Sequence, residues 1–450
     1  MVHRKRDSIE ARRPNAPAIP PPIARPALAD LPPAFAAVKQ ADELIGRGKV
    51  VEATVIEKSI VDPTAQKLLE WAPLRRGGSE LGFQRYDAFI RANPVWPSIP
   101  LLRRRAEAAL WRERADAATV RSFLGGQPAS PIGKLVLARE LMGQGDRVAA
   151  EREVRSVWRS ERLSAELEGE VLSGFPDALT RGDHQTRMDR RIGAKDFGAA
   201  MRAAKRIGND QVAIVKACIA AEAKSANGGK LLDAVPTEAR NDLGYALCRI
   251  HWLMRNDSPG SNIHGRVVTP KEDIAAAVKL ALAASQEDLR QQDTDEWWRE
   301  RRALARKLLD RGEAKAAYQV TGSALPDNPY YRAEFHFMAG WIALRYLSDP
   351  QTASKHFARI DEGATDPHIL ARAAYWRGRA AEAAGNITEM HAEYEAAGRY
   401  PTAYYGQLAR VRLRLGSIAL RAPPQMADTA RSEVLHAASI LLRSAHMISC

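Results

Sequence analysis

The stretch Ala371–Gly416, ARAAYWRGRAAEAAGNITEMHAEYEAAGRYPTAYYGQLARVRLRLG, predicts three short helices in succession. In its first part, small apolar residues recur at helical spacing around Trp376. Gly378 lies among them and is small enough for a neighbouring helix to approach closely. The pair Gly385-Asn386 then stops the helix and turns the chain. These features predict a helical hairpin that stacks on its neighbours.

The second and third helices follow from the same stretch. A helix around Met390–Ala397 must end before Pro401, because proline has no backbone N–H and cannot continue it. A third apolar face then begins, formed by Tyr404, Tyr405, Leu408 and Val411. The stretch as a whole therefore predicts three short helices that form a stacking helical hairpin.

A repeat extends this pattern upstream. Gly312, Asp349 and Asn386 each mark a turn and are each 37 residues apart, close to the roughly 34-residue tetratricopeptide period. Gly145-Asp146 begins a similar unit. A helix pair of this size cannot bury its apolar face alone, so the pairs must stack. We expect an all-α solenoid, a TPR-like superhelix of short hairpins that closes into a ring or a U, with almost no sheet.

The chain divides into three parts on composition. Residues 1–33 are rich in Arg and Pro and are predicted to be extended or disordered. Residues 34–416 carry the helical pattern and form the predicted superhelix. Two segments break it: Ser173–Arg190, predicted as a polar link between helix groups, and Asn256–Thr269, predicted as a polar loop. Residues 417–450 are a separate C-terminal part.

Composition limits the class of protein. The formal net charge is +13, but basic residues are interleaved with acidic ones, as in Arg299-Glu300-Arg301-Arg302, which is typical of solvated helix faces; the alternative is a binding track. No basic motif interleaved with aromatic residues indicates nucleic-acid binding, and no apolar run is long enough to span a membrane. Three cysteines make no disulfide framework, and we predict that Cys218 and Cys248 are small core residues.

Two runs carry a family resemblance. The sequences AAYWRGRAAEAAG (373–385) and YPTAYYGQLA (400–409) resemble the end of the superhelix in soluble lytic murein transglycosylases. The run FHFMAGWIALRYLSDPQTASKHFARI (335–360) resembles the preceding helical pair in that family. The resemblance covers residues 300–416 best and is weaker upstream. It implies a periplasmic protein that acts on peptidoglycan, with residues 417–450 as the truncated start of the family's linker domain.

The family's catalytic motifs do not transfer to this chain. The resemblance implies a Glu-Ser motif, whose Glu is the acid and base, and a Gly-Leu-Met-Gln stretch that lines the glycan cleft; neither occurs here. Ser-Glu occurs at 79–80, 160–161 and 432–433, in the reversed order. We therefore assign no catalytic residue, and whether the chain is an enzyme stays open. Glycosidic cleavage needs a carboxyl group that stays protonated near neutral pH.

Other candidate motifs are weak. The glycine runs 46–49 and 228–230 lack Walker spacing and are predicted to be surface turns. Cys248 and His251 have ligand-like spacing but no second pair nearby, so a core pair is favoured over a zinc site. Tyr404 and Tyr405 are candidates for stacking on a sugar ring, although we expect at least one of them to pack against the next layer. No cofactor or metal site is predicted.

The prediction for function is a non-catalytic scaffold or guide for peptidoglycan glycan strands, with other cell-wall proteins as further partners. The alternative is a helical-repeat module that binds a protein inside the cell. The N-terminus MVHRKRDSIEARRPNAP has a basic start without an apolar region behind it, which is not the pattern of a secretory signal peptide. This observation conflicts with the periplasmic location that the resemblance implies.

Overall fold

The computed structural model describes residues 33–78, 80–254, 262–263, 266–267, 271–416, 418 and 427. The predicted extended N-terminus (1–33) and the predicted linker domain (417–450) therefore lie almost wholly outside the described residues, as does Cys450. The chain divides into two units, of which the first contains α1 to α5 and the second contains α6 to α22.

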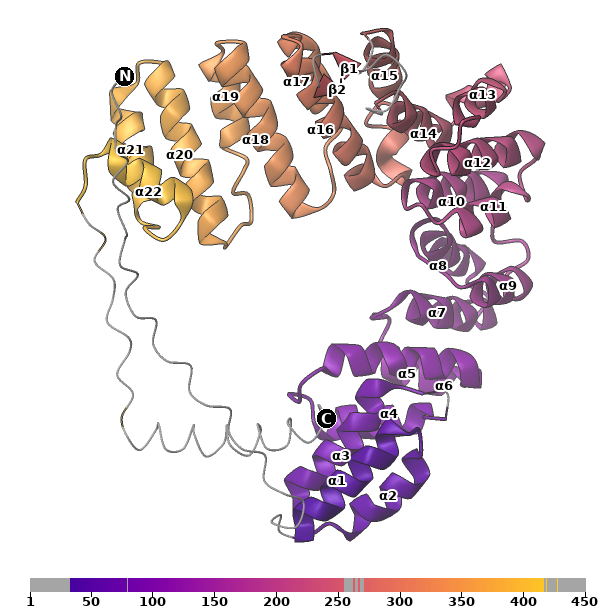
Figure 1. Cartoon of the computed structure of the whole chain (residues 1–450). Coiled ribbons are helices and arrows are strands. Elements are labelled where there is room, and N and C mark those ends of the chain that lie inside the picture. Colours follow the sequence, from indigo (N-terminus) through magenta and orange to yellow (C-terminus); the bar gives the residue numbers. More distant parts are fainter. Residues whose placement is uncertain are drawn as a thin grey trace, which may run out of the picture. The chain divides into compact units, whose positions relative to one another are not determined.

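Helices account for nearly all of the regular secondary structure in the described residues (Figure 1). Those of the first unit are α1 (Pro33–Gly46), α2 (Val50–Ser59), α3 (Pro63–Arg76), α4 (Phe83–Ala92) and α5 (Ile99–Glu113). Those of the second unit are α6 (Ala117–Leu124), α7 (Pro131–Gly143), α8 (Arg147–Ser160), α9 (Ala165–Gly174), α10 (Arg181–Gly193), α11 (Phe197–Ala204), α12 (Asn209–Glu222), α13 (Gly228–Asp233), α14 (Leu243–Leu253), α15 (Lys271–Ala283), α16 (Thr294–Asp310), α17 (Ala314–Gly322), α18 (Pro329–Tyr346), α19 (Pro350–Phe357), α20 (Pro367–Ala383), α21 (Ile387–Gly398) and α22 (Tyr404–Arg412).

The remaining regular elements are small. They are the 3-10 helices η2 (Thr237–Asn241) and η3 (Asp288–Gln291) and the strands β1 (Asn262–Ile263) and β2 (Arg266–Val267). The two strands pair antiparallel, with Ile263 opposite Arg266, inside the segment predicted as a polar loop. The all-α prediction is confirmed for the described residues. None of the helices described is both long and apolar enough to cross a membrane.

The predicted turns between helices have a common local design. Gly145, Gly312, Ser348 and Gly385 each adopt a left-handed backbone conformation, with φ between 55° and 85°. In most of these turns the next residue caps the following helix: the side chains of Asp146, Asp349 and Asn386 each accept a hydrogen bond from the backbone N–H three residues on.

The repeat register therefore needs a correction. Gly312 is equivalent to Ser348 and Gly385, which are 36 and 37 residues further along in turn, and not to the capping residues Asp349 and Asn386. The residue that precedes α17, Glu313, makes no side-chain cap.

Glycines let the two helices of a hairpin approach closely. A Cβ atom built on Gly378 of α20 would lie 2.7 Å from the ring of Tyr394 in α21, which confirms the prediction made for Gly378. The preceding hairpin repeats the arrangement, with Gly340 of α18 facing Phe357 of α19 at 2.5 Å. In Figure 1 the pairs α16–α17, α18–α19 and α20–α21 follow one another in the second unit. Each aromatic ring fills the space that its glycine leaves.

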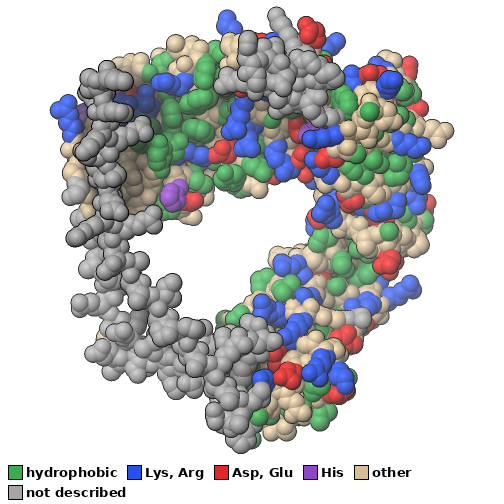
Figure 2. Space-filling model, viewed as in Figure 1, with side chains coloured by type: hydrophobic (Ala, Val, Ile, Leu, Met, Phe, Trp, Pro, Cys, Tyr) green, Lys and Arg blue, Asp and Glu red, His purple; other side chains and the backbone are tan. Residues whose placement is uncertain are grey.

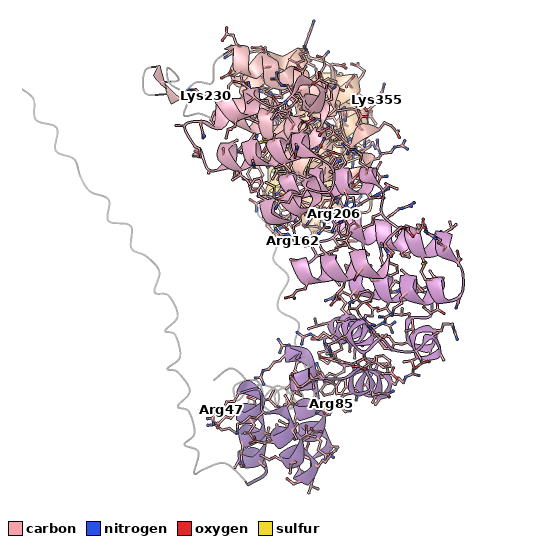
Figure 3. All side chains as sticks on the ribbon, turned by 90° about the vertical axis from the view of Figure 1, so that its right-hand side faces the viewer. Arg47, Arg85, Arg162, Arg206, Lys230 and Lys355 are labelled. Atoms are coloured by element: carbon pink, nitrogen blue, oxygen red, sulfur yellow. The ribbon has the colours of Figure 1, made fainter. Side chains whose placement is uncertain are left out.

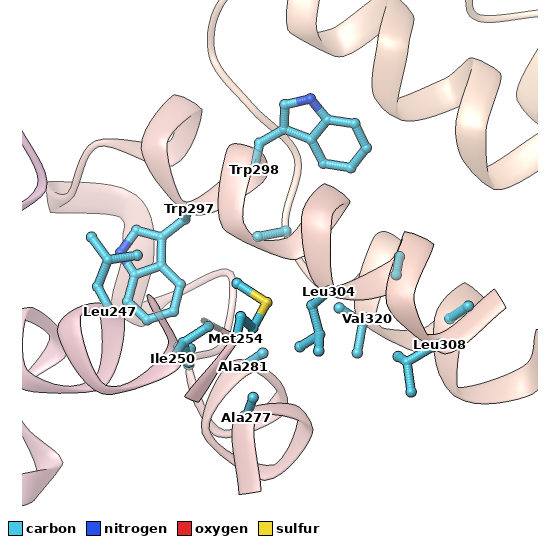
Figure 4. Close-up of a cluster of buried hydrophobic side chains, with 14 of the residues drawn as sticks. Leu247, Ile250, Met254, Ala277, Ala281, Trp297, Trp298, Leu304, Leu308 and Val320 are labelled. Atoms are coloured by element: carbon cyan, nitrogen blue, oxygen red, sulfur yellow. The ribbon is translucent and has the colours of Figure 1, made fainter. Parts of the chain in front are cut away.

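Two adjacent tryptophans show how consecutive layers join. Trp297 and Trp298 lie near the start of α16 and are both buried. Trp297 lies beside Leu247 and Ile250 of α14, whereas Trp298 points away from them (Figure 4). The ring centroid of Trp298 is 5.5 Å from that of Phe335 in α18. One helix thus contributes aromatic side chains to the layers before and after it.

Two sequence predictions are wrong, one about an apolar helix face and one about a link between helices. Tyr404 and Val411 are 65% and 73% exposed, because α22 packs on α20 and α21 along one face only. The segment Ser173–Arg190 is not a simple polar link, since α10 begins at Arg181 inside it. Thr180 and Asp183 form a reciprocal capping box that starts α10, and this signal is visible in the sequence as Thr-x-x-Asp.

Candidate functional site

An aromatic cluster packs between the last three described helices, α20, α21 and α22, with Tyr404 at its exposed edge. The ring centroid of Tyr375 lies 5.6 Å from that of Tyr394 and 5.5 Å from that of Tyr405. Tyr405 is partly buried, and its ring also contacts Trp376 and Tyr404. Tyr404 remains exposed, whereas Tyr405 packs into the layer. This confirms the expectation that at least one of the two rings packs against its neighbours. An exposed ring supported by a packed ring is suited to stack on a sugar.

Charged side chains hold this cluster in place. The Tyr394 hydroxyl donates a hydrogen bond of 2.8 Å to Glu382, and Arg412 pairs with the same carboxylate at 2.7 Å. Arg379 also contacts Glu382 at 3.0 Å, and its guanidinium lies 6.0 Å from the Trp376 ring centroid. Burial and the hydrogen bond to Glu382 raise the pKa of Tyr394, so its phenol stays protonated. The helices α20, α21 and α22 are therefore linked by one polar network around Glu382.

A layer of buried charges around α10 was missed by sequence reasoning. Arg187 is fully buried, and its guanidinium lies 4.7 Å from the ring centroid of Trp158. It donates to Glu168 at 2.5 Å and to the carbonyl oxygen of Trp158 at 2.7 Å. Arg202 of α11 pairs with the other side of Glu168 at 2.5 Å. Because Glu168 of α9 pairs with both arginines and Arg187 also bonds to Trp158 of α8, these contacts join α8, α9, α10 and α11.

Asp189 differs from its neighbours because its hydrogen bonds come from neutral donors. The backbone N–H of Gly244 and the amide of Gln185 each donate to Oδ1 at 3.1 Å, and the amide of Gln292 faces Oδ2 at 3.4 Å. Burial, and then the nearby Asp242 carboxylate, raise the pKa of Asp189 to about 8. Asp189 is therefore largely protonated at neutral pH and is enclosed by the fold.

Glu57 in the first unit meets one requirement for glycosidic acid catalysis. Burial first, and then Glu70, raise its pKa to about 7. Arg85 lies between the two carboxylates, bonded to Glu70 and 3.9 Å from Glu57, and it also donates to Thr54. Glu57 therefore lies beside an arginine that is already paired with Glu70. The cluster is thus an ion-pair network that joins α2, α3 and α4.

The weak motifs of the sequence have structural roles. The ring nitrogens of His251 face Glu300 at 3.2 Å and Glu222 at 3.7 Å, while Cys248 contacts Cys218. Cys248 and His251 therefore do not converge on one point, and the described residues contain no cluster that could hold a metal ion. The run 228–230 is not the predicted surface turn, because it begins α13 and Gly228 is buried under Trp252, where a Cβ atom would lie 2.7 Å from the ring.

Basic residues are dispersed over the surface. Figure 2 shows Lys and Arg side chains intermixed with Asp and Glu on the visible face. In the second unit, Figure 3 labels Arg162 after α8, Arg206 after α11, Lys230 in α13 and Lys355 in α19, which are separate elements. Arg301 is an exception to the predicted solvated face: it is buried over Trp297 and donates to two carbonyl oxygens of the α15 end. Burial lowers the pKa of Arg301 to about 10.

Comparison with known proteins identifies a similar fold. The lytic transglycosylase Slt from Pseudomonas aeruginosa, solved as an inactive mutant, matches 93% of this chain with a TM-score of 0.55 and 16% identity. The fold is that of Slt over this length. This chain covers 65% of Slt. At 16% identity the likeness concerns the fold alone.

Further comparisons add little. The 70-kDa soluble lytic transglycosylase of Escherichia coli matches 86% of this chain and 74% of its own length, at 15% identity, with a TM-score of 0.37. The 70-kDa soluble lytic transglycosylase in complex with bulgecin A matches 92% of this chain and 85% of its own, at 13% identity, with a TM-score of 0.36. Both scores are too low to carry an argument. No protein-family model and no curated protein matches the sequence.

Proposed function

We propose that this chain is a superhelical scaffold that guides peptidoglycan glycan strands and does not itself cleave them. The observation that carries the proposal is the fold likeness to Slt over 93% of the chain. The runs 373–385 and 400–409, which resemble the end of the family's superhelix, support it from the sequence. A periplasmic location and other cell-wall partners belong to the same proposal.

Tyr404 is the proposed point of contact with the glycan. Its ring is 65% exposed and rests on Tyr405 with a centroid distance of 5.1 Å. Stem peptides of peptidoglycan carry carboxylates, and a chain of net charge +13 attracts such a polymer over a distance set by salt. Stacking would supply the short-range contact, and the net positive charge would supply the long-range attraction.

The test is a pull-down with purified sacculi at low and high salt. We expect binding at low salt that weakens at high salt, and a loss of about fivefold in affinity for Tyr404→Ala, corresponding to about 1 kcal/mol of stacking energy. Tyr346→Ala is the matched control, because Tyr346 on α18 is also exposed, at 45%, but lies outside this cluster. Equal binding by both variants would remove Tyr404 from the proposal.

The same incubation tests the absence of cleavage. We expect no release of anhydro-muropeptides above a boiled control, because the sequence contains neither the Glu-Ser nor the Gly-Leu-Met-Gln motif. Release would overturn the non-catalytic proposal.

One observation favours the alternative function, a module that binds a protein. Val51 and Val55 lie one turn apart on α2 and are 79% and 68% exposed, and Val61 beyond the helix is 94% exposed. Apolar side chains at this spacing form a stripe that a partner helix can cover. Failure to bind sacculi at low salt would shift weight to this alternative.

A further inference from the structure

Two thiols from different helices meet in the core of the second unit. Cys218 lies on α12 and Cys248 on α14, and these helices pack against each other. Cys218 is 1% exposed, and Cys248 packs as a partly buried residue against the same hydrophobic cluster. Burial raises the pKa of the Cys218 thiol well above its ordinary value, and a hydrogen bond to Cys248 raises it further. The fold therefore holds as neighbours two cysteines that the sequence separates widely.

A small cavity lies beside this pair. It has a volume of about 30 Å³ and is lined by both cysteines and by side chains of α10, α12, α14 and α16. Lys195, Glu222 and His251 also line it and are partly exposed to solvent. Of the two thiols, Cys248 is the less buried and is therefore the one that a reagent reaches first. This arrangement pairs an accessible cysteine with a buried one behind it.

We propose that Cys218 and Cys248 form a reversible disulfide by exchange with a disulfide oxidant of the glutathione class. The thiolate of Cys248 attacks one sulfur of the oxidant, which forms a mixed disulfide and releases one thiol. The thiolate of Cys218, after losing its proton to water, attacks Sγ of Cys248 and releases the second thiol. Two protein thiols are oxidised, one small disulfide is reduced to two thiols, and no other reactant is needed.

The Cys218–Cys248 disulfide would join α12 to α14 next to the buried charged layer around α10. Gly244 at the start of α14 donates its backbone N–H to Asp189 of α10, so α14 already contacts the charged layer. A covalent link between α12 and α14 closes a loop through α13 and η2 and restricts the unfolded chain. We therefore expect the oxidised chain to melt several degrees higher than the reduced one.

The experiment uses the full chain with Cys450→Ser, which leaves Cys218 and Cys248 as its cysteines. The protein is incubated with glutathione disulfide, alkylated in denaturant, and digested without reduction for mass spectrometry. We expect one cross-linked peptide pair containing positions 218 and 248, no alkylation of either cysteine, and a rise in melting temperature that dithiothreitol reverses. Alkylation of both cysteines after exposure to the oxidant would overturn the proposal.

A second variant separates the two steps. With Cys218→Ser added, the mixed disulfide at Cys248 has no thiol to resolve it, and we expect the glutathione adduct to accumulate. If the adduct also persists in the protein that retains Cys218, the two sulfurs do not meet and the proposal is wrong. The cross-linked peptide requires no core substitution, so the first experiment decides the matter even if Cys218→Ser does not fold. This inference does not depend on the proposed glycan function.

Discussion

Replacing Asp189 by asparagine should remove a loss of folding stability that grows with pH in the second unit. Asp189 is buried, accepts hydrogen bonds from neutral groups, and has a pKa of about 8 against an ordinary value of 3.8. Between these two pH values the folded state binds a proton that the unfolded state has released. Stability must therefore fall as pH rises through this window, and most of the loss occurs before pH 8.

The magnitude follows from the shift. One pKa unit corresponds to 1.36 kcal/mol, so the cost at pH 7 is about 4 kcal/mol and at pH 5 about 1.5 kcal/mol. Asparagine is neutral at both values and nearly the same size as a protonated aspartic acid. In the Asp189→Asn variant, the side-chain oxygen can keep the bonds from Gly244 and Gln185, while the introduced NH₂ faces Gln292, whose amide can turn to accept. The stability difference between variant and wild type should grow by about 2 to 3 kcal/mol from pH 5 to pH 7.

Urea unfolding followed by far-ultraviolet circular dichroism at the two pH values measures this difference. Hydrogen exchange of the α10 amides reports on the same layer locally. Comparing variant with wild type at each pH cancels the titrating groups that do not interact with position 189. Asp177→Asn is the control, because Asp177 is exposed at the surface and should show the same difference from wild type at both pH values. Parallel pH dependences for D189N and wild type would refute the reasoning.

Three further predictions concern packing and titration. Gly378→Ala should destabilise the chain by about 1 to 3 kcal/mol, because the added Cβ would lie 2.7 Å from the Tyr394 ring. The control, Gly169→Ala, has open space around it in α9 and should stabilise the chain by up to about 1 kcal/mol. Thermal melts compare the two variants, and equal shifts in melting temperature would contradict the close packing at Gly378. Trp376→Ala should cost about 2 to 3 kcal/mol in urea unfolding, since the side chain is only partly buried but contacts four aromatic rings; an unchanged midpoint would count against this. His336 is buried, and burial lowers its pKa to about 4. Because the unfolded state then binds more protons than the folded state, stability should rise by about 3 kcal/mol between pH 4 and 6.5. The H336Q variant should lose this rise in thermal melts across that range, and an unchanged pH dependence of its stability would show that another group is responsible.

Local signals explain why the sequence predicted the hairpins correctly. A left-handed residue such as Gly385, followed by a capping side chain such as Asn386, is determined by a few neighbouring residues. Helix existence and turn positions depend on short-range backbone energetics, so they are readable without knowledge of distant contacts. The capping box Thr180–Asp183 was also readable, and it marks the start of the helix that was predicted as a link.

Only the tertiary structure decides which residues pack against each helix face. Helical spacing placed Tyr404 and Tyr405 on one apolar face, but only the packing of α22 on α20 and α21 buries one ring and exposes the other. The same holds for Asp189, whose raised pKa depends on Gly244 and Gln292 from distant segments. A sequence specifies which side chains share a face, because that depends on a fixed period. It does not specify which groups face them, because burial, charge pairing and thiol contacts arise only when helices far apart in the chain come together.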